Sequence, residues 1–126
     1  MGRVQVAGTI VLIAVGVVLS DRALSQSEDV HSVQALYEEC TSHQVLMQGI
    51  CAGYIQGVAD AMSASYSVLK AKGLDFNLGY CAGADVTTEQ LIRVFKNWHD
   101  QNPKFWHMPK ELGVIGALQE SWPCTH

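Results

Sequence analysis

The chain has 126 residues, eight Lys or Arg against twelve Asp or Glu, and a formal net charge of −4. An acidic chain without a basic run does not fit a nucleic-acid-binding protein, because such binding depends on clustered Lys and Arg. The same lack of a basic run weakens a membrane-surface role.

The first residues have the features of an export signal. Arg3 gives a short basic start, an apolar run extends over residues 6–19, and Ala23-Leu24-Ser25 places small residues at the −3 and −1 positions of a cleavage site. A transmembrane helix needs about 20 apolar residues, and this run is shorter. We therefore predict a cleaved signal peptide over residues 1–25 and one domain over residues 26–126, with no membrane association after cleavage.

The spacing of apolar residues predicts four main helices and no strand. They are expected over residues 33–42, 44–72, 87–102 and 109–122. Ser32 is positioned to cap the first, and Thr87 with Gln90 forms a capping box for the third. Lys70 and Lys72 followed by Gly73 are typical of a helix end. The predicted fold is a small all-α bundle of four to five helices tied by two disulfides.

Regularly spaced apolar rows run along three of these helices, and the row on the fourth helix is expected to form its inner face. They are Leu46, Ile50, Tyr54, Val58 and Met62 on the second helix, Leu91, Val94, Phe95 and Trp98 on the third, and Leu112, Ile115, Leu118 and Trp122 on the fourth.

The second predicted helix also carries a stripe of small residues. The stripe repeats every four positions and consists of Gly49, Gly53, Gly57, Ala61 and Ser65. Each interior glycine costs about 1 kcal/mol relative to alanine, so three on one face need a compensating gain. Close approach of another backbone supplies such a gain. We expect packing against another helix of this chain, and an interface between two copies stays as the alternative.

Four cysteines, Cys40, Cys51, Cys81 and Cys124, follow the predicted signal. An even number in an exported domain indicates two disulfides, and four cysteines allow three pairings. On an up-and-down path the first helix ends where the second begins, which brings Cys40 and Cys51 together. The third helix starts near the end of the second and the fourth returns to that end, which brings Cys81 to Cys124. We predict the pairs Cys40–Cys51 and Cys81–Cys124.

No residue pattern indicates catalysis or a cofactor. There is no Cys-x-x-Cys pair and no glycine-rich phosphate loop, and neither a nucleophile with its base nor a pair of carboxylates at a catalytic spacing can be singled out. His99 and His107, with Asp100 between them, are weak metal-ligand candidates. The simpler expectation is that His99 extends the surface of its helix and His107 packs beside Trp106.

An ordered set of residues runs through nearly the whole predicted domain. It consists of Leu36-Tyr37-x-x-Cys40, Cys51-x-Gly53-Tyr54-Ile55-x-Gly57-x-x-Asp60-Ala61, Cys81, Thr87-x-x-Gln90-Leu91, Trp98, Asn102-Pro103, His107 and Trp122-Pro123-Cys124. This set resembles the Rap1a/Tai family of immunity proteins. The resemblance implies a small periplasmic all-α protein, often a homodimer and not an enzyme. Such a protein binds a peptidoglycan amidase effector of type VI secretion and covers its Cys/His cleft.

No family contact residue maps onto this chain through a matching motif, so the partner-binding residues are predicted on physical grounds. Connections displayed by a rigid scaffold commonly carry function. We therefore expect the effector to contact residues 74–86 or the turn at residues 102–108. The candidate partner-binding residues are Phe76, Asp85, Phe105 and Trp106.

Two other functions stay open at this point. The first is a small periplasmic stress protein, similar to an acid chaperone, whose histidines His31, His43, His99 and His107 become charged on acidification and which then loosens to bind clients. The second is an enzyme of unrecognised type.

Overall fold

The computed structural model describes residues 30–74 and 79–124. These residues form α2 (Val33–Thr41), α3 (Val45–Ala71), α4 (Thr88–Gln101), the short 3-10 helix η1 (Pro103–Phe105) and α5 (Lys110–Ser121). Each α-helix lies within one residue of its predicted limits. In this part of the chain the only β pairing is an isolated bridge between Ser32 and Pro109. The all-α prediction is confirmed.

The predicted helix ends are formed by the predicted residues. The Ser32 side chain accepts from the Ala35 N–H at 3.1 Å, and Thr87 and Gln90 form the complete capping box. At the end of α3, Gly73 has a φ of +69°, which costs glycine no steric strain. The Leu74 N–H then donates to the Leu69 carbonyl at 3.0 Å, the longer bond of a Schellman motif.

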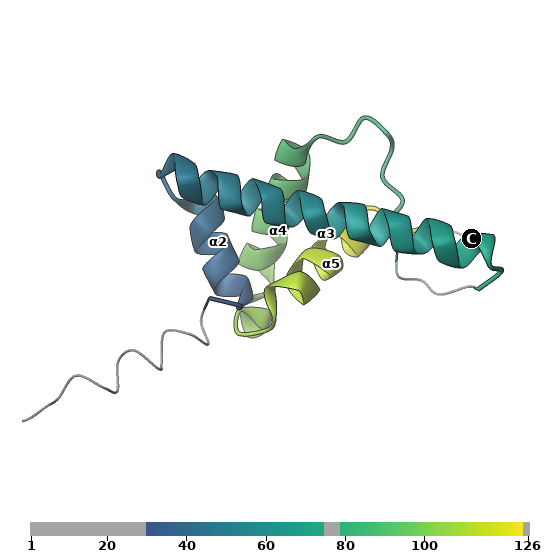
Figure 1. Ribbon diagram of the computed structural model, residues 1–126. Coiled ribbons are helices and arrows are strands. Elements are labelled where there is room, and N and C mark those ends of the chain that lie inside the picture. The colour runs from purple at the N-terminus through teal and green to yellow at the C-terminus, as the bar shows by residue number, and fades with distance from the viewer. Residues whose placement is uncertain (1–29, 75–78, 125–126) are drawn as a thin grey trace, which may run out of the picture.

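The 27-residue α3 runs along the whole molecule, and α2, α4 and α5 lie on one side of it (Figure 1). The core fills the space between the four helices. Its fully buried side chains include Val33, Leu36, Ile55, Leu91, Phe95, Val114 and Leu118. No described helix is both long and apolar enough to cross a membrane. The predicted signal peptide lies outside the described residues.

Both predicted disulfides are present. Cys40–Cys51 joins the end of α2 to the first turns of α3, and Cys81–Cys124 fastens the segment before α4 to the chain just after α5. The Cys81 N–H also donates to the Trp122 carbonyl at 2.8 Å. Residues 79–81 are therefore held against the end of α5, as expected for a segment tied by Cys81.

The predicted apolar rows of α3 and α5 were correct in part. Met62 and Leu118 are buried, and the partly buried members packed against the core are Tyr54, Val58, Ile115 and Trp122. On α3 the buried residues are Cys51, Ile55, Ala59 and Met62, whereas the predicted members Leu46 and Ile50 are 70% and 42% exposed. On α5 the buried residues are Gly113, Val114, Ala117 and Leu118, and Leu112 is exposed. The buried faces include the small residues Ala59 on α3 and Gly113 and Ala117 on α5, so a row of large apolar residues did not by itself define them.

The expectation that the α3 glycines pack against another helix of this chain was also wrong. A Cβ atom added at Gly49, Gly53 or Gly57 would meet nothing within 4 Å. The glycines that permit close approach are on α5. A Cβ at Gly113 would lie 2.5 Å from Val33 Cγ2, and one at Gly116 would lie 3.3 Å from Trp98 Cζ2. Glycine at these positions lets α5 approach α2 and the Trp98 indole.

Candidate partner-binding surfaces

The described residues offer no site for metal chemistry. They contain no group of three or more His, Cys, Asp and Glu residues able to hold a metal ion. All four cysteines are in disulfides and none is a free thiol. His107 is exposed and His99 is buried, and the pair suggested as metal ligands belongs to no such group.

The structure separates the predicted partner-binding residues into two sites. Asp85 is exposed in the segment before α4, whereas Phe105 and Trp106 follow the end of α4. The 14 residues of α4 span about 21 Å at 1.5 Å per residue. The two sites thus lie at opposite ends of a helix, as the path of the chain in Figure 1 shows. Phe76 lies outside the described residues.

The turn between α4 and α5 is anchored to α2. The first backbone N–H groups of a helix have no partner inside it. Here the Val33 N–H donates to the Met108 carbonyl at 2.8 Å, and the Gln34 N–H donates to the Trp106 carbonyl at 2.9 Å. The turn therefore supplies partners for the first N–H groups of α2 and presents a fixed backbone.

Trp106 is exposed to 38% but is held in place. Its ring is parallel to the His99 ring, with centroids 4.7 Å apart. Its indole N–H donates to the His99 carbonyl at 2.9 Å. Phe105 is half-buried and its ring lies parallel to that of Trp98, with centroids 5.8 Å apart. Trp106 thus combines an exposed aromatic surface with a fixed position, as an interface anchor requires.

His99 does not extend the helix surface, as we expected from the sequence; its exposure is 2%. Its ring lies between two aromatic rings, that of Trp106 and that of Tyr37, whose centroid is 3.7 Å away. Nδ1 is 3.1 Å from Asp100 Oδ1, and Nε2 is 2.9 Å from Gln34 Oε1. The burial follows from the stacking, because α2 and the turn after α4 cover both faces of the ring.

These contacts shift the pKa of two neighbouring groups. The hydrogen bond from His99 is the largest cause that holds the pKa of Asp100 below its ordinary value, and a hydrogen bond from Tyr37 adds to it. The same bond to Asp100, followed by burial, raises the pKa of Tyr37. At neutral pH the cluster therefore contains an ionised carboxylate and a neutral phenol.

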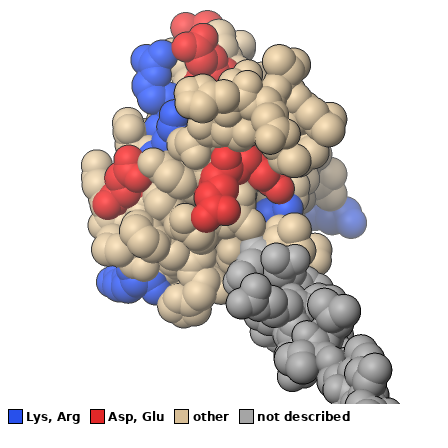
Figure 2. Space-filling view, turned by 90° about the vertical axis from the view of Figure 1, so that its left-hand side faces the viewer, with Lys and Arg blue, Asp and Glu red and all other residues tan. Residues whose placement is uncertain are grey.

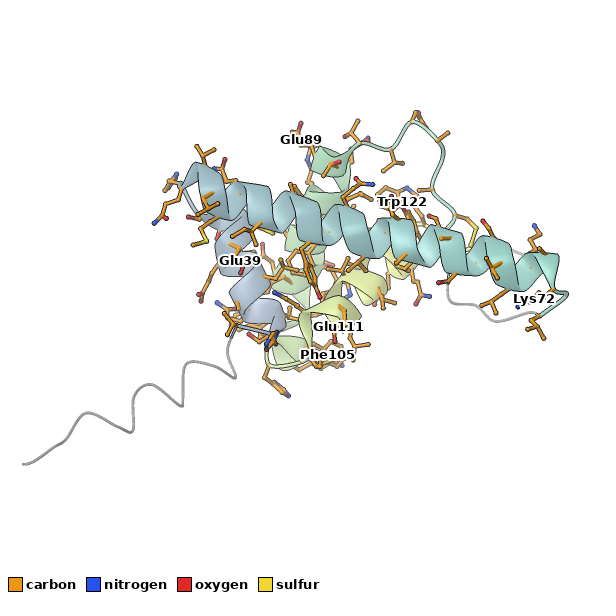
Figure 3. The ribbon with its side chains drawn as sticks, in the orientation of Figure 1. Glu39, Lys72, Glu89, Phe105, Glu111 and Trp122 are labelled. Atoms are coloured by element: carbon orange, nitrogen blue, oxygen red, sulfur yellow. A yellow bond between two sulfur atoms is a disulfide. The ribbon has the colours of Figure 1, made fainter. Side chains whose placement is uncertain are left out.

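A second polar group connects α3 to α5. The Tyr54 hydroxyl donates to Glu111 Oε2 at 3.2 Å. Burial first, then the Glu111 charge and more weakly that of Glu39, raise the pKa of Tyr54 to about 12. Figure 3 shows Glu39 on α2 and Glu111 on α5, both below α3 in this view. This location carries negative charge beside a phenol that keeps its proton.

One side of α3 is open to solvent along its whole length. We call it the outer face of α3; it consists of Leu46, Gly49, Ile50, Gly53, Gly57, Ala61, Ala64 and Val68, all exposed. The helix has two charged residues, Asp60 and Lys70, and Asp60 accepts from the Gln56 amide at 2.8 Å. Figure 2, seen from the side of α2 and the start of α3, shows a surface that is mostly uncharged, with acidic groups near its centre. The outer face of α3 combines apolar and small residues, as a helix–helix interface does.

A groove of about 320 Å³ lies between α4 and α5. Its lining residues are Val94, Asn97, Trp98, Gln101, Glu120 and Ser121. The lining contains no histidine, lysine or cysteine. Glu120 is its one carboxylate, and therefore the one candidate base beside Ser121 in this lining. The groove gives no support for an enzyme.

The observations define a class: a small all-α domain held by two disulfides, with exposed apolar residues and no catalytic group assembled among the described residues. Comparison with protein families is more specific, since the model of the Rap1a immunity proteins matches residues 32–124. The chain therefore belongs to the Rap1a immunity protein family, whose members are immunity proteins of type VI secretion. A search among curated proteins and another among solved structures gave no match.

Proposed function

We propose that this chain is a periplasmic immunity protein that binds a peptidoglycan amidase effector of type VI secretion and inhibits it by covering the active-site cleft. The observation that carries the proposal is the family match over residues 32–124, which includes both disulfides and all four helices. Family membership implies a secreted effector as partner. The choice of an amidase, the periplasmic location and the cleavage of residues 1–25 are parts of the proposal.

Two features of the structure support inhibition by binding. Both disulfides bridge separate parts of the chain, which suits a domain that works in an oxidising compartment. Trp106 offers exposed aromatic surface on a fixed backbone, so little conformational entropy is lost when a partner covers it. We propose Trp106 and Phe105 as effector contacts, with Asp85 and Phe76 on a second, separate surface.

Inhibition is tested with the purified, disulfide-bonded protein and a panel of secreted peptidoglycan amidases. We expect one amidase to be retained by the immobilised protein and to lose its activity at an equimolar ratio. Retention of none, with protein whose two disulfides are verified, would contradict the proposal. Amino-terminal sequencing of the protein exported to the periplasm tests the cleavage after Ser25.

The contact residues are tested in the same assay. Trp106→Ala is expected to weaken binding of the amidase at least about tenfold, because truncation of a central aromatic anchor commonly costs 1.4 kcal/mol or more. Leu112→Ala, which truncates another exposed apolar residue, serves as the control and should bind as the wild type does. Equal affinities of all three proteins would show that Trp106 is not a contact.

We further propose that the protein is a homodimer joined through the outer face of α3. With glycine at three positions in the first half of that face, a second α3 backbone can approach closely. The face has few charges, so two copies of an acidic chain meet there without strong repulsion.

The dimer is tested by analytical ultracentrifugation. We expect the wild type to sediment as a dimer and Gly53→Leu, which adds a side chain at the centre of the face, as a monomer. Asn97→Leu introduces leucine at an exposed position of α4, away from that face, and should remain a dimer. A wild type that stays monomeric at about 0.5 mM would have a dimer dissociation constant too high for a stable dimer, and this result would exclude the proposal.

The alternative function, an acid-activated chaperone, makes a different prediction on acidification. A chaperone of this kind loosens and binds an apolar dye at about pH 3, the range in which acid-expanded states expose apolar surface. The immunity function requires no such change. Dye binding with loss of α-helix packing, together with no amidase partner, would favour the alternative.

A further inference from the structure

The His99 side chain has an arrangement of hydrogen bonds that the proposed function does not use. The side chain is buried between α2, α4 and the turn after α4. Each ring nitrogen faces an oxygen: Nδ1 faces Asp100 Oδ1 at 3.1 Å and Nε2 faces Gln34 Oε1 at 2.9 Å. The protonation of the ring follows from whether these two oxygens are acceptors.

The orientation of the Gln34 amide is fixed by its second contact. Gln34 Nε2 donates to Glu38 Oε1 at 2.9 Å. If the amide were reversed, its oxygen would face the Glu38 carboxylate, and two acceptors would be in contact. The oxygen therefore faces His99. Asp100 is an acceptor as well, because its carboxyl group is ionised at neutral pH.

A neutral imidazole has one N–H and one bare nitrogen. In this site the bare nitrogen would face an oxygen that has no proton to donate, which leaves a buried pair of acceptors. An imidazolium donates from both nitrogens. In addition, the faces of Tyr37 and Trp106 attract a cation placed between them. We propose that His99 is held as a doubly protonated imidazolium, a cationic clamp that joins α2, α4 and the turn that carries Trp106.

The clamp depends on the ionised Asp100 carboxylate. The groups facing the ring are Gln34 and Tyr37 from α2, Asp100 from α4 and the Trp106 indole from the turn, with Glu38 behind Gln34; Lys96 is near enough to Asp100 to lower the pKa of its carboxyl. Protonation of Asp100 in acid removes the negative acceptor of the clamp. Because the pKa of Asp100 is lowered in the folded state, its contribution to stability is present at neutral pH and is lost as the pH falls through that pKa.

Nitrogen NMR of the histidine rings tests this directly on the purified, disulfide-bonded protein, labelled with ¹⁵N. In a neutral ring the two nitrogens have widely separated shifts, whereas in an imidazolium they nearly coincide. At pH 7.5 we expect nearly coincident shifts for His99, and the exposed His43 and His107 serve as internal references in the same spectrum. One bare nitrogen on His99 at pH 7.5, in the folded protein, overturns the proposal.

Two variants test the cause. Asp100→Asn removes the negative acceptor, and we expect the doubly protonated fraction of His99 at pH 7.5 to fall several-fold. Asp85→Asn removes an exposed carboxylate at the other end of α4 and should leave that fraction unchanged. Equal fractions in all three proteins overturn the assigned role of Asp100. If Asp100→Asn does not fold, the wild-type spectrum still decides whether the ring is charged.

Discussion

The contact between α5 and α2 gives the sharpest prediction of stability. In Gly113→Ala the new Cβ would lie 2.5 Å from Val33 Cγ2, and also 3.4 Å from Val33 Cγ1 and 3.5 Å from Trp98 Cζ3. Val33 cannot easily make room. Its side chain is β-branched and fully buried, and its N–H is bonded to the Met108 carbonyl. A backbone shift is therefore required.

The magnitude follows from two opposing effects. Overpacking a core costs about 1–3 kcal/mol, and the upper value applies here because Val33 is fixed. Replacing an interior helical glycine by alanine stabilises the helix by about 1 kcal/mol. The net loss is about 2 kcal/mol, which lowers the urea midpoint of a small domain by about 1–2 M.

Gly53→Ala is the matched control, since a Cβ at that position of α3 meets nothing within 4 Å. It should gain about 0.5–1 kcal/mol from helix propensity alone. Both variants are measured by urea unfolding followed by circular dichroism, at a dilution where the protein is monomeric. A Gly113→Ala protein as stable as the wild type, or two variants that shift the midpoint in the same direction, would refute the close α2–α5 contact.

Three further predictions concern the disulfides, Tyr54 and Trp106. The Cys81–Cys124 disulfide has a sequence separation of 43, and Cys40–Cys51 has one of 11. On the loop-entropy model, replacing the first pair by alanine should lower the free energy of unfolding by about 4 kcal/mol, and replacing the second by about 3 kcal/mol. Urea unfolding of the two double variants measures both losses. Because the pKa of Tyr54 is raised to about 12, the folded state resists ionisation, and this contribution to stability, complete below about pH 10, is lost between about pH 10 and pH 12. Ultraviolet titration should show Tyr54 as a late phenol, beside Tyr37, whose pKa is also raised. Glu111→Gln should bring the Tyr54 phenol alone to lower pH; an unchanged midpoint would show that Glu111 has no influence. Trp106→Phe removes the hydrogen bond to the His99 carbonyl but keeps a stacked ring, so its stability in thermal unfolding should fall by about 1 kcal/mol. Trp106→Ala also removes the ring and should lose more stability; equal losses in the two variants would mean that stacking contributes little.

Local features of the helices were predictable because their causes are local. Ser32, Thr87 with Gln90, and Gly73 define helix ends through contacts within a few residues, and all act as expected. The disulfide pairing also followed from the order of four helices on an up-and-down path. Even the resemblance to the Rap1a immunity proteins depends on the order of residues along the chain, and the family comparison agrees with it.

The faces of the helices and the position of His99 were not predictable, because they depend on partners distant in sequence. The α3 glycines and the α5 glycines have the same local chemistry, yet α2 and Trp98 pack against Gly113 and Gly116 while the outer face of α3 is uncovered. A histidine two residues before the end of α4 suggested an exposed side chain, but Tyr37 and Trp106 cover both sides of its ring.

The sequence by itself determined the helices, their ends, the cysteine pairs and the family, since each depends on residue order and on contacts between near neighbours. The tertiary structure alone decided which small residues serve the core, which remain exposed, and which polar side chain is enclosed. Those outcomes depend on how the four helices pack around one core. Close packing there is settled by the shapes of all the partners together.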